Sequence, residues 1–118
     1  MTTQEVANRL VELCRKGQVL QAQEELFADD VTSYSPDMKG GMEITVGKEA
    51  NIEKGKQFAS MIEELHSAHI SDPVVAGKWA SISWTMDVTM AGRGRSNMEE
   101  ICVYKIENGK IVSEQFHY

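Results

Sequence analysis

Two glutamates in the last fifth of the chain are the strongest candidates for chemistry. Glu100 and Glu114 lie in two strand-like segments that a hairpin at Asn108-Gly109 would bring side by side. Burial in an apolar cavity beside a second carboxyl raises the pKa of a carboxyl group, because both effects disfavour its ionised form. The pair therefore predicts a catalytic general acid or base. In the alternative, both glutamates reach solvent or pair with Arg or Lys and are inert.

The direction of these side chains depends on the length of the hairpin turn. A three-residue turn with Gly109 as a bulge would place Cys102 opposite Glu114. It would direct one set of side chains toward the concave face: Glu100, Cys102, Tyr104, Glu114, Phe116 and Tyr118. A two-residue turn would shift the register by one, and Ser113, Gln115 and His117 would point inward instead. We favour the bulged turn, because it buries two aromatic side chains.

Apolar and aromatic residues near these glutamates are candidates for binding a substrate. Trp84 and Met86 lie on the inward side of an alternating segment, where they either fill the core or line an apolar ligand site. Tyr34 and Tyr104 have hydroxyl groups that need a partner when buried, so either could donate to a ligand oxygen. The predicted substrate-binding set is Tyr34, Trp84, Met86, Cys102, Tyr104, Phe116 and Tyr118.

Several other kinds of site are not supported by the sequence. There is no Cys/His cluster, so no metal site and no cofactor are predicted. Gly92-Arg93-Gly94 is not followed by a helix, which argues against a phosphate-binding loop. With 18 acidic against 12 basic residues, the net charge of −6 would repel nucleic acid. No apolar run could span a bilayer and no secretion signal is evident, so a cytoplasmic protein is expected.

The elements that must position these residues begin with helices. Thr2-Thr3-Gln4-Glu5 forms a capping-box pattern, and an apolar stripe then continues to a stop at Gly17. A second short helix, with Leu20, Leu26 and Phe27 facing inward, is expected to end at Asp29-Asp30. A strand is expected at 31–34, a loop without regular structure at 37–47, and a third helix over 47–65.

The second half of the chain has the pattern of a β-meander. Strands are predicted at 66–76, 79–90, 95–106 and 110–118, and the second of these alternates strictly between apolar and polar residues. Helices followed by strands indicate a segregated α+β fold rather than repeated βαβ units. We predict one domain spanning residues 1–118, with a curved antiparallel sheet wrapped around N-terminal helices.

Three local segments resemble the nuclear transport factor 2-like superfamily and its SnoaL-like branch. They are Leu26-Phe27-Ala28-Asp29-Asp30-Val31, Val46-Gly47-Lys48-Glu49-Ala50 and Asn108-Gly109-Lys110-Ile111-Val112. The resemblance covers nearly the whole chain. It implies a cone-shaped, cystatin-like domain with a pocket between sheet and helices, and a homodimer formed through the outer sheet faces.

Ketosteroid isomerase belongs to the same superfamily, and its catalytic groups can be carried over by alignment. Its oxyanion-hole tyrosine falls at Leu10, its carboxylate base at Ser35, and its protonated aspartic acid at Cys102. None of the three residues can do the corresponding chemistry, which argues against ketosteroid isomerisation by that apparatus. The same alignment supports the bulged turn.

These observations leave three hypotheses for function. The first is a dimeric protein that binds a small apolar or amphipathic ligand, and the second is a cofactor-independent isomerase, cyclase or hydrolase that uses Glu100 or Glu114. The third is a protein-association module without catalysis. An open pocket whose carboxyls are paired to Arg or Lys would favour the first hypothesis. An open pocket with two adjacent carboxyls would favour the second, and a pocket filled by side chains would favour the third.

Overall fold

A computed structural model describes residues 1–37 and 39–118, which form helices packed on one sheet. The elements follow the order α1 (Thr3–Arg15), α2 (Val19–Leu26), β1 (Phe27–Pro36), β2 (Met42–Val46), α3 (Lys48–Ser60), β3 (Ile62–Ile70), β4 (Val74–Ala76), β5 (Trp79–Met90), β6 (Gly94–Glu107) and β7 (Lys110–His117). The predicted α+β class is confirmed. None of the described helices is long and apolar enough to cross a bilayer.

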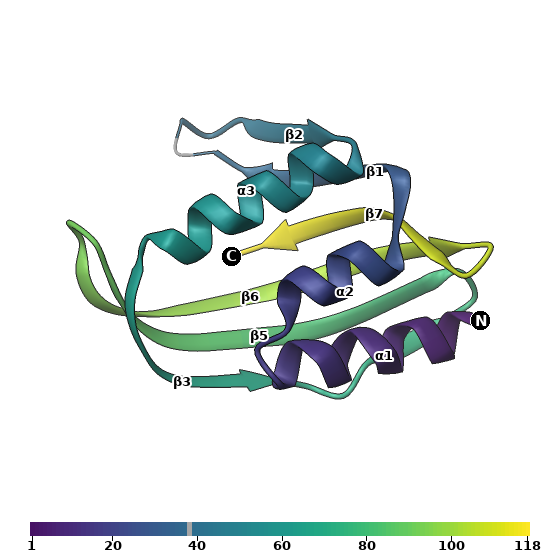
Figure 1. The fold of residues 1–118 in the computed structure, drawn as a ribbon, viewed down its shortest axis with the longest axis horizontal. Helices are drawn as coiled ribbons and strands as arrows, with labels where there is room; N and C mark the ends of the chain where they lie inside the picture. Colours follow the sequence, from purple (N-terminus) through teal and green to yellow (C-terminus); the bar gives the residue numbers. More distant parts are fainter. Residues whose placement is uncertain (38) are drawn as a thin grey trace.

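The sheet is curved, and the three helices lie on its concave side (Figure 1). Its strand order is β2-β1-β7-β6-β5-β3, with the short β4 also paired to β5. All pairs are antiparallel except β1 with β7, which is parallel, whereas the sequence predicts an antiparallel sheet throughout. The parallel pair joins the first and last strands of the chain, so β1 lies beside the strand that carries Glu114.

Helix α1 begins as predicted. The Thr2 side chain accepts a hydrogen bond from the Glu5 backbone N–H, and the Glu5 carboxylate accepts one from the Thr2 N–H, which completes the capping box. One stripe of α1 is buried in the core: Val6, Ala7, Leu10, Val11, Leu13 and Cys14. The helix is held on the concave sheet face by this stripe.

The end of α2 differs from the prediction. Phe27 opens β1, and Asp29 and Asp30 lie inside that strand instead of ending a helix. The strand tolerates them because both are exposed, in the stretch where the β1–β7 register shifts. Leu20 was expected to face inward but is exposed.

Two boundaries between 37 and 70 were also predicted wrongly. The expected loop at 37–47 contains β2, an edge strand paired with β1; its Met38 lies outside the described residues. Helix α3 ends at Ser60, because the chain from Ile62 to Ile70 pairs with β5 as β3. The apolar residues of 61–65 suit either a helix or a strand, and pairing with the sheet decides between them.

The β6–β7 hairpin determines which way Glu114 points. Its turn has two residues, since Glu107 pairs with Lys110, and both Asn108 (φ 52°) and Gly109 (φ 76°) adopt the left-handed conformation. The bulge expected at Gly109 lies instead at Val112, where the register shifts. Tyr104 therefore lies opposite Glu114, and Cys102 lies opposite Phe116, not Glu114. Because Val112 is an extra residue in β7, the side chains after it point to the same faces as they would after the expected bulge at Gly109. The inward direction predicted for Glu114 is therefore correct.

Candidate active site on the concave face

Glu114 lies near the centre of the sheet, beneath the helices. Its side chain is 8% exposed, and its carboxylate accepts a hydrogen bond of 2.6 Å from the hydroxyl of Ser33, which is 1% exposed. Ser33 lies beside Glu114 in the parallel β1–β7 pair, so both side chains point to the same face. The Ser33 hydroxyl is well placed to hold the carboxyl group in one orientation.

The surroundings of Glu114 favour its protonated form. The pKa of Glu114 is raised to about 7, mainly by burial and to a smaller extent by the charge of Glu100, against the opposing effects of the Ser33 hydrogen bond and the positive charge of Lys54. A carboxyl group with this pKa is present in both protonation states at neutral pH. It can therefore donate or accept a proton there.

Glu100 is the second carboxyl on the concave face. It lies directly across from Trp84 in the β5–β6 pair. One of its oxygens accepts a hydrogen bond from the Cys102 thiol at 3.5 Å. Burial raises the pKa of Glu100 above its ordinary value, because it disfavours the ionised form.

The buried thiols of Cys14 and Cys102 and the Tyr104 hydroxyl are held in their neutral forms. Burial raises the pKa of the Cys14 thiol to about 12, and the pKa of the Cys102 thiol is raised for the same reason. The fully buried Tyr104 hydroxyl has a pKa well above its ordinary value. A thiol acts as a nucleophile only as its thiolate, so neither cysteine is suited to that role at neutral pH.

A lysine from α3 extends over the same face. The Lys54 ammonium donates to the Ser35 hydroxyl at 3.1 Å and lies 3.6 Å from the Glu43 carboxylate. Sequence reasoning identified neither Lys54 nor Ser33 as functional. The alternation of Ser33 and Ser35 around Tyr34 was a usable signal, because two polar residues on the inward side of a strand need hydrogen-bond partners.

Two predicted site residues are misplaced. Tyr34 lies between the buried Ser33 and Ser35 in β1, so its side chain points to the convex face. Tyr118 follows the end of β7 and is 71% exposed. Partial burial raises the pKa of Tyr118, and the charges of Glu100 and Glu43 add to the rise, so this side chain lies near the rim of the site and not inside it.

The remaining predicted residues share the concave face with the two carboxyls. Trp84 and Phe116 are partly buried against the main core, and Cys102 and Tyr104 belong to it. Met86 pairs with Met98 in β6 and Ala68 in β3, and is partly exposed. The structure thus places six of the predicted residues on the same concave face as Glu114, with Tyr104 directly opposite it and the others spread along β5, β6 and β7: Trp84, Met86, Glu100, Cys102, Tyr104 and Phe116.

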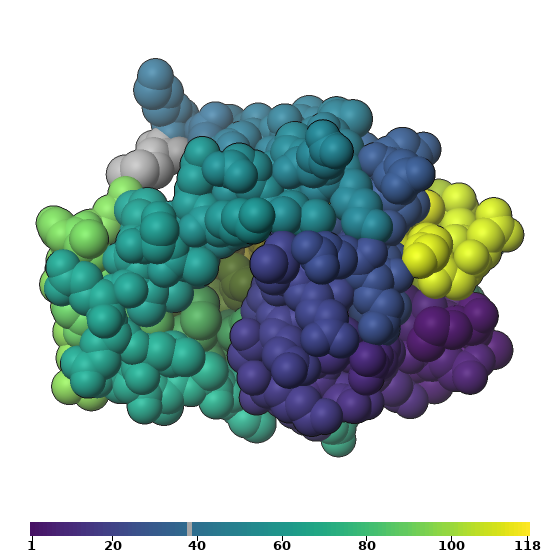
Figure 2. Space-filling model, viewed as in Figure 1, coloured from purple at the N-terminus to yellow at the C-terminus, as the bar shows by residue number. Residues whose placement is uncertain are grey.

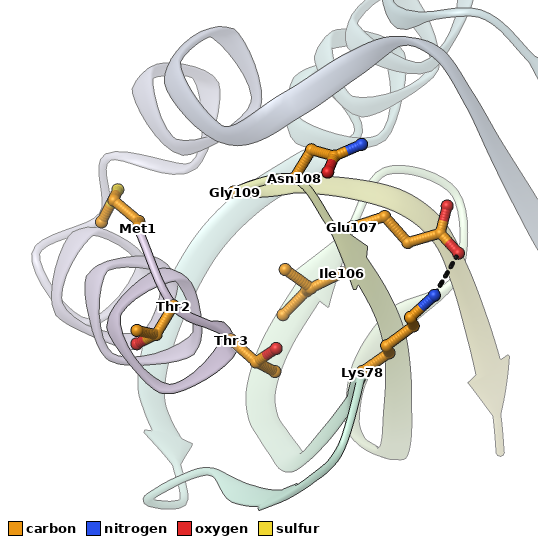
Figure 3. Close-up of a pocket in the computed structure, with 8 residues that line it drawn as sticks. All are labelled: Met1, Thr2, Thr3, Lys78, Ile106, Glu107, Asn108 and Gly109. Carbon is orange, nitrogen blue, oxygen red and sulfur yellow. Dashed lines mark ion pairs between the residues drawn. The ribbon is translucent and has the colours of Figure 1, made fainter.

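The space-filling view shows a recess between α3 and α2, with the sheet at its floor (Figure 2). Two pockets among the described residues lie outside this recess. One, of about 590 Å³, lies beside the start of α1 and the β6–β7 turn, where Lys78 pairs with Glu107 (Figure 3). The other, of about 360 Å³, lies between α1 and Asp72-Pro73. Neither includes Glu100 or Glu114. Within the described residues, no group of three or more His, Cys, Asp or Glu side chains could hold a metal ion.

A family model for the SnoaL-like domain matches residues 1–118. The chain belongs to the SnoaL-like domain family. A Mesorhizobium loti protein, named as a candidate SnoaL-like polyketide cyclase and also as a carbohydrate phosphatase, has a similar structure. It is 35% identical, the match covers 100% of both chains, and the TM-score is 0.90. None of the curated proteins matches the chain significantly.

Two more distant solved structures share the fold. An NTF2-like protein of unknown function from Burkholderia pseudomallei is 20% identical with a TM-score of 0.76, and the match covers 100% of this chain and 92% of that one. A Catenulispora acidiphila protein with a ketosteroid isomerase-like fold, solved with trimethylamine, is 20% identical with a TM-score of 0.74. That match covers 99% of this chain and 87% of the other. The predicted membership of the SnoaL-like branch is confirmed.

Proposed function

We propose that the protein binds a small apolar or amphipathic molecule between the concave sheet face and the helices, and that Glu114 transfers a proton to or from it. The observation that carries this proposal is the buried Glu114 carboxyl, whose pKa of about 7 suits a general acid or base. Its hydrogen bond from Ser33 would orient it toward a bound molecule.

The alternative, in which Glu100 and Glu114 pair with Arg or Lys and take no part in chemistry, has less support. Among the ion pairs of the described residues, none includes Glu100 or Glu114. Burying a glutamate without an ion-pair partner lowers the stability of the protein. A buried glutamate with no such partner is therefore better explained by a chemical role than by a structural one.

The reaction class is a cofactor-independent isomerisation, cyclisation or hydrolysis. The name of the Mesorhizobium loti relative, at 35% identity over the full chain, includes both a polyketide cyclase and a carbohydrate phosphatase, which fit cyclisation and hydrolysis within this class. Acid–base catalysis by one carboxyl suits such a reaction, because proton transfer is the main chemical demand when no electrons are exchanged with a cofactor.

The test begins with native mass spectrometry of the purified protein to identify a retained small molecule. That molecule is then incubated with the protein in D2O, and deuterium incorporation is followed by mass spectrometry. Wild type and Glu99→Gln, a change at an exposed glutamate of the neighbouring strand β6, are expected to exchange. Glu114→Gln is expected to lose at least 100-fold in exchange rate, the low end for general acid–base catalysis. Equal rates in Glu114→Gln and wild type would contradict the proposal.

Further parts of the proposal concern the assembly. We propose a homodimer that associates through the convex sheet face, with residues 1–118 as one domain. Apolar side chains are exposed on that face: Met42, Ile44, Val46, Trp79 and Ile101. A patch of this kind is typical of a protein–protein interface. Two buried free cysteines, Cys14 and Cys102, suit a reducing compartment, which supports a cytoplasmic location.

A further inference from the structure

The indole N–H of Trp84 is a buried donor without a partner. Among buried side-chain nitrogen and oxygen atoms of the described residues, Trp84 Nε1 is the one that makes no hydrogen bond. Buried indole N–H groups ordinarily find an acceptor, because leaving one unsatisfied is destabilising. This atom therefore needs an explanation that the packing of the core alone does not supply.

The neighbours of Trp84 on the concave face are mostly apolar. It lies across from Ile70 in β3, and Ile82 and Met86 precede and follow it on the same side of β5. Such neighbours offer few polar partners, whereas a buried water usually makes about three hydrogen bonds. A water molecule is thus a poor substitute for the missing acceptor.

Glu100 is the polar neighbour of Trp84, directly opposite in β6. Its carboxyl accepts a hydrogen bond from the Cys102 thiol, and burial raises its pKa. Two neighbouring strands thus present an indole N–H and a carboxyl group side by side. The ionised form of this carboxyl would repel an anion and its protonated form would add a second donor, so in either state the complementary group is an uncharged oxygen acceptor on an apolar molecule.

We propose that Trp84 is a specificity-determining residue whose Nε1–H donates a hydrogen bond to an uncharged acceptor oxygen of the ligand. This inference rests on the ligand site proposed above and adds which chemical group the site selects. A ligand without the oxygen leaves the indole N–H unsatisfied, so the site discriminates against it.

Two probes of nearly identical shape separate the hydrogen bond from apolar contact. 2-Acetylnaphthalene carries a carbonyl oxygen where 2-isopropenylnaphthalene carries a methylene group. Calorimetry is expected to give about tenfold tighter binding of the ketone to wild type, the effect of one hydrogen bond to a buried donor. Trp84→Phe is expected to remove that preference. The matched variant Trp79→Phe, at an exposed indole on the convex face, is expected to keep it.

A direct readout comes from the two indole N–H signals in the ¹H–¹⁵N spectrum, one for each tryptophan. The Trp84 signal is expected to move downfield with the ketone and much less with the alkene, while the Trp79 signal stays in place. Equal affinities of the two probes for wild type, or a ketone preference that survives in Trp84→Phe, would overturn the Trp84 inference and leave the ligand site standing. If neither probe binds or moves signals of the concave face, the ligand site and this inference both fall.

Discussion

Glu114 links the stability of the protein to pH. The folded protein holds this carboxyl at a pKa of about 7, against an ordinary value of 4.5. Below pH 4.5 both folded and unfolded states keep the proton, so stability is at its full value. Between pH 4.5 and 7 the unfolded state loses the proton first, and the free energy of unfolding falls as pH rises.

Replacing Glu114 with glutamine is expected to remove this pH dependence. Glutamine has similar shape and can still accept from Ser33, but it does not ionise. Wild type should lose roughly 3 kcal/mol relative to Glu114→Gln between pH 4.5 and 7. Urea unfolding followed by circular dichroism at several pH values measures the difference. Parallel stability curves for the two proteins would mean that Glu114 has an ordinary pKa.

Ser33→Ala is expected to raise the pKa of Glu114 above that of wild type. The hydroxyl donates to the carboxylate at 2.6 Å and so stabilises the ionised form. Titration of ¹³C-labelled glutamate side chains by NMR measures the shift. Ser113→Ala, on the opposite face of β7, is the matched control and should leave the titration unchanged. A lower pKa in Ser33→Ala would contradict this account of the site.

Glu100 and Glu114 are candidates from the sequence alone, whereas Ser33 and Lys54 become candidates only in the structure. The two glutamates stand out because charged residues interrupt strands that otherwise alternate. The role of Ser33 depends on the parallel pairing of β1 with β7. This pairing allows Ser33 to donate a hydrogen bond to Glu114, which is 81 residues away in the sequence. No local pattern predicts such a pairing. Tyr34 was misplaced because the direction of β1 side chains depends on the same pairing.

At the scale of elements, the β6–β7 turn requires a positive φ at Asn108. Asn adopts this conformation more readily than other residues with a side chain, and glycine adopts it freely. Asn108→Ala is therefore expected to lower the free energy of unfolding by about 1 kcal/mol, while Asn108→Gly changes it little. Urea unfolding of both variants is the measurement. An equal loss in both would indicate that the asparagine side chain, not the backbone conformation, is what matters.

Asn51 joins α3 to two strands. Its buried side-chain amide is within hydrogen-bond distance of the carbonyl oxygens of Val31, Thr45 and Gly47. Asn51→Asp places a carboxylate against these oxygens, so it is expected to cost more than about 3 kcal/mol at pH 7. Asn51→Ala removes the donor without adding charge and should cost about 1–2 kcal/mol.

Thermal unfolding at pH 7 and pH 3 tests the Asn51 prediction. Protonation of the new carboxyl at low pH removes its charge and supplies one donor, so the deficit of Asn51→Asp relative to Asn51→Ala should shrink. A deficit that is the same at both pH values would show that charge is not the cause.

Elements with strong local signals were predicted best. The capping box placed the start of α1, and strict alternation gave β5 its observed limits of Trp79 and Met90. The edge strand β2 and the start of β3 were missed. Their residues have ambiguous local preferences, and it is pairing with β1 and β5 that makes them strands.

For the whole molecule, association through the convex face can be tested with one charge. Ile44→Arg places a cation within the exposed apolar patch and is expected to convert a dimer to a monomer, because an unpaired charge disfavours a desolvated interface. Sedimentation velocity measures the mass in solution. Leu20→Arg, at an exposed leucine of α2 on the helical side, is the control and should remain dimeric. Dimers that persist in Ile44→Arg would exclude this part of the convex face as the contact.

The bulge at Val112 has a consequence for how the chain can vary in length. Since Ile111 and Ser113 already pair with consecutive residues of β6, Val112 is surplus to the ladder. A shorter chain lacking this one amino acid could form an uninterrupted hairpin with every later side chain unchanged in direction. Strand β7 can thus lose Val112 while the Glu114 side chain remains buried on the concave face.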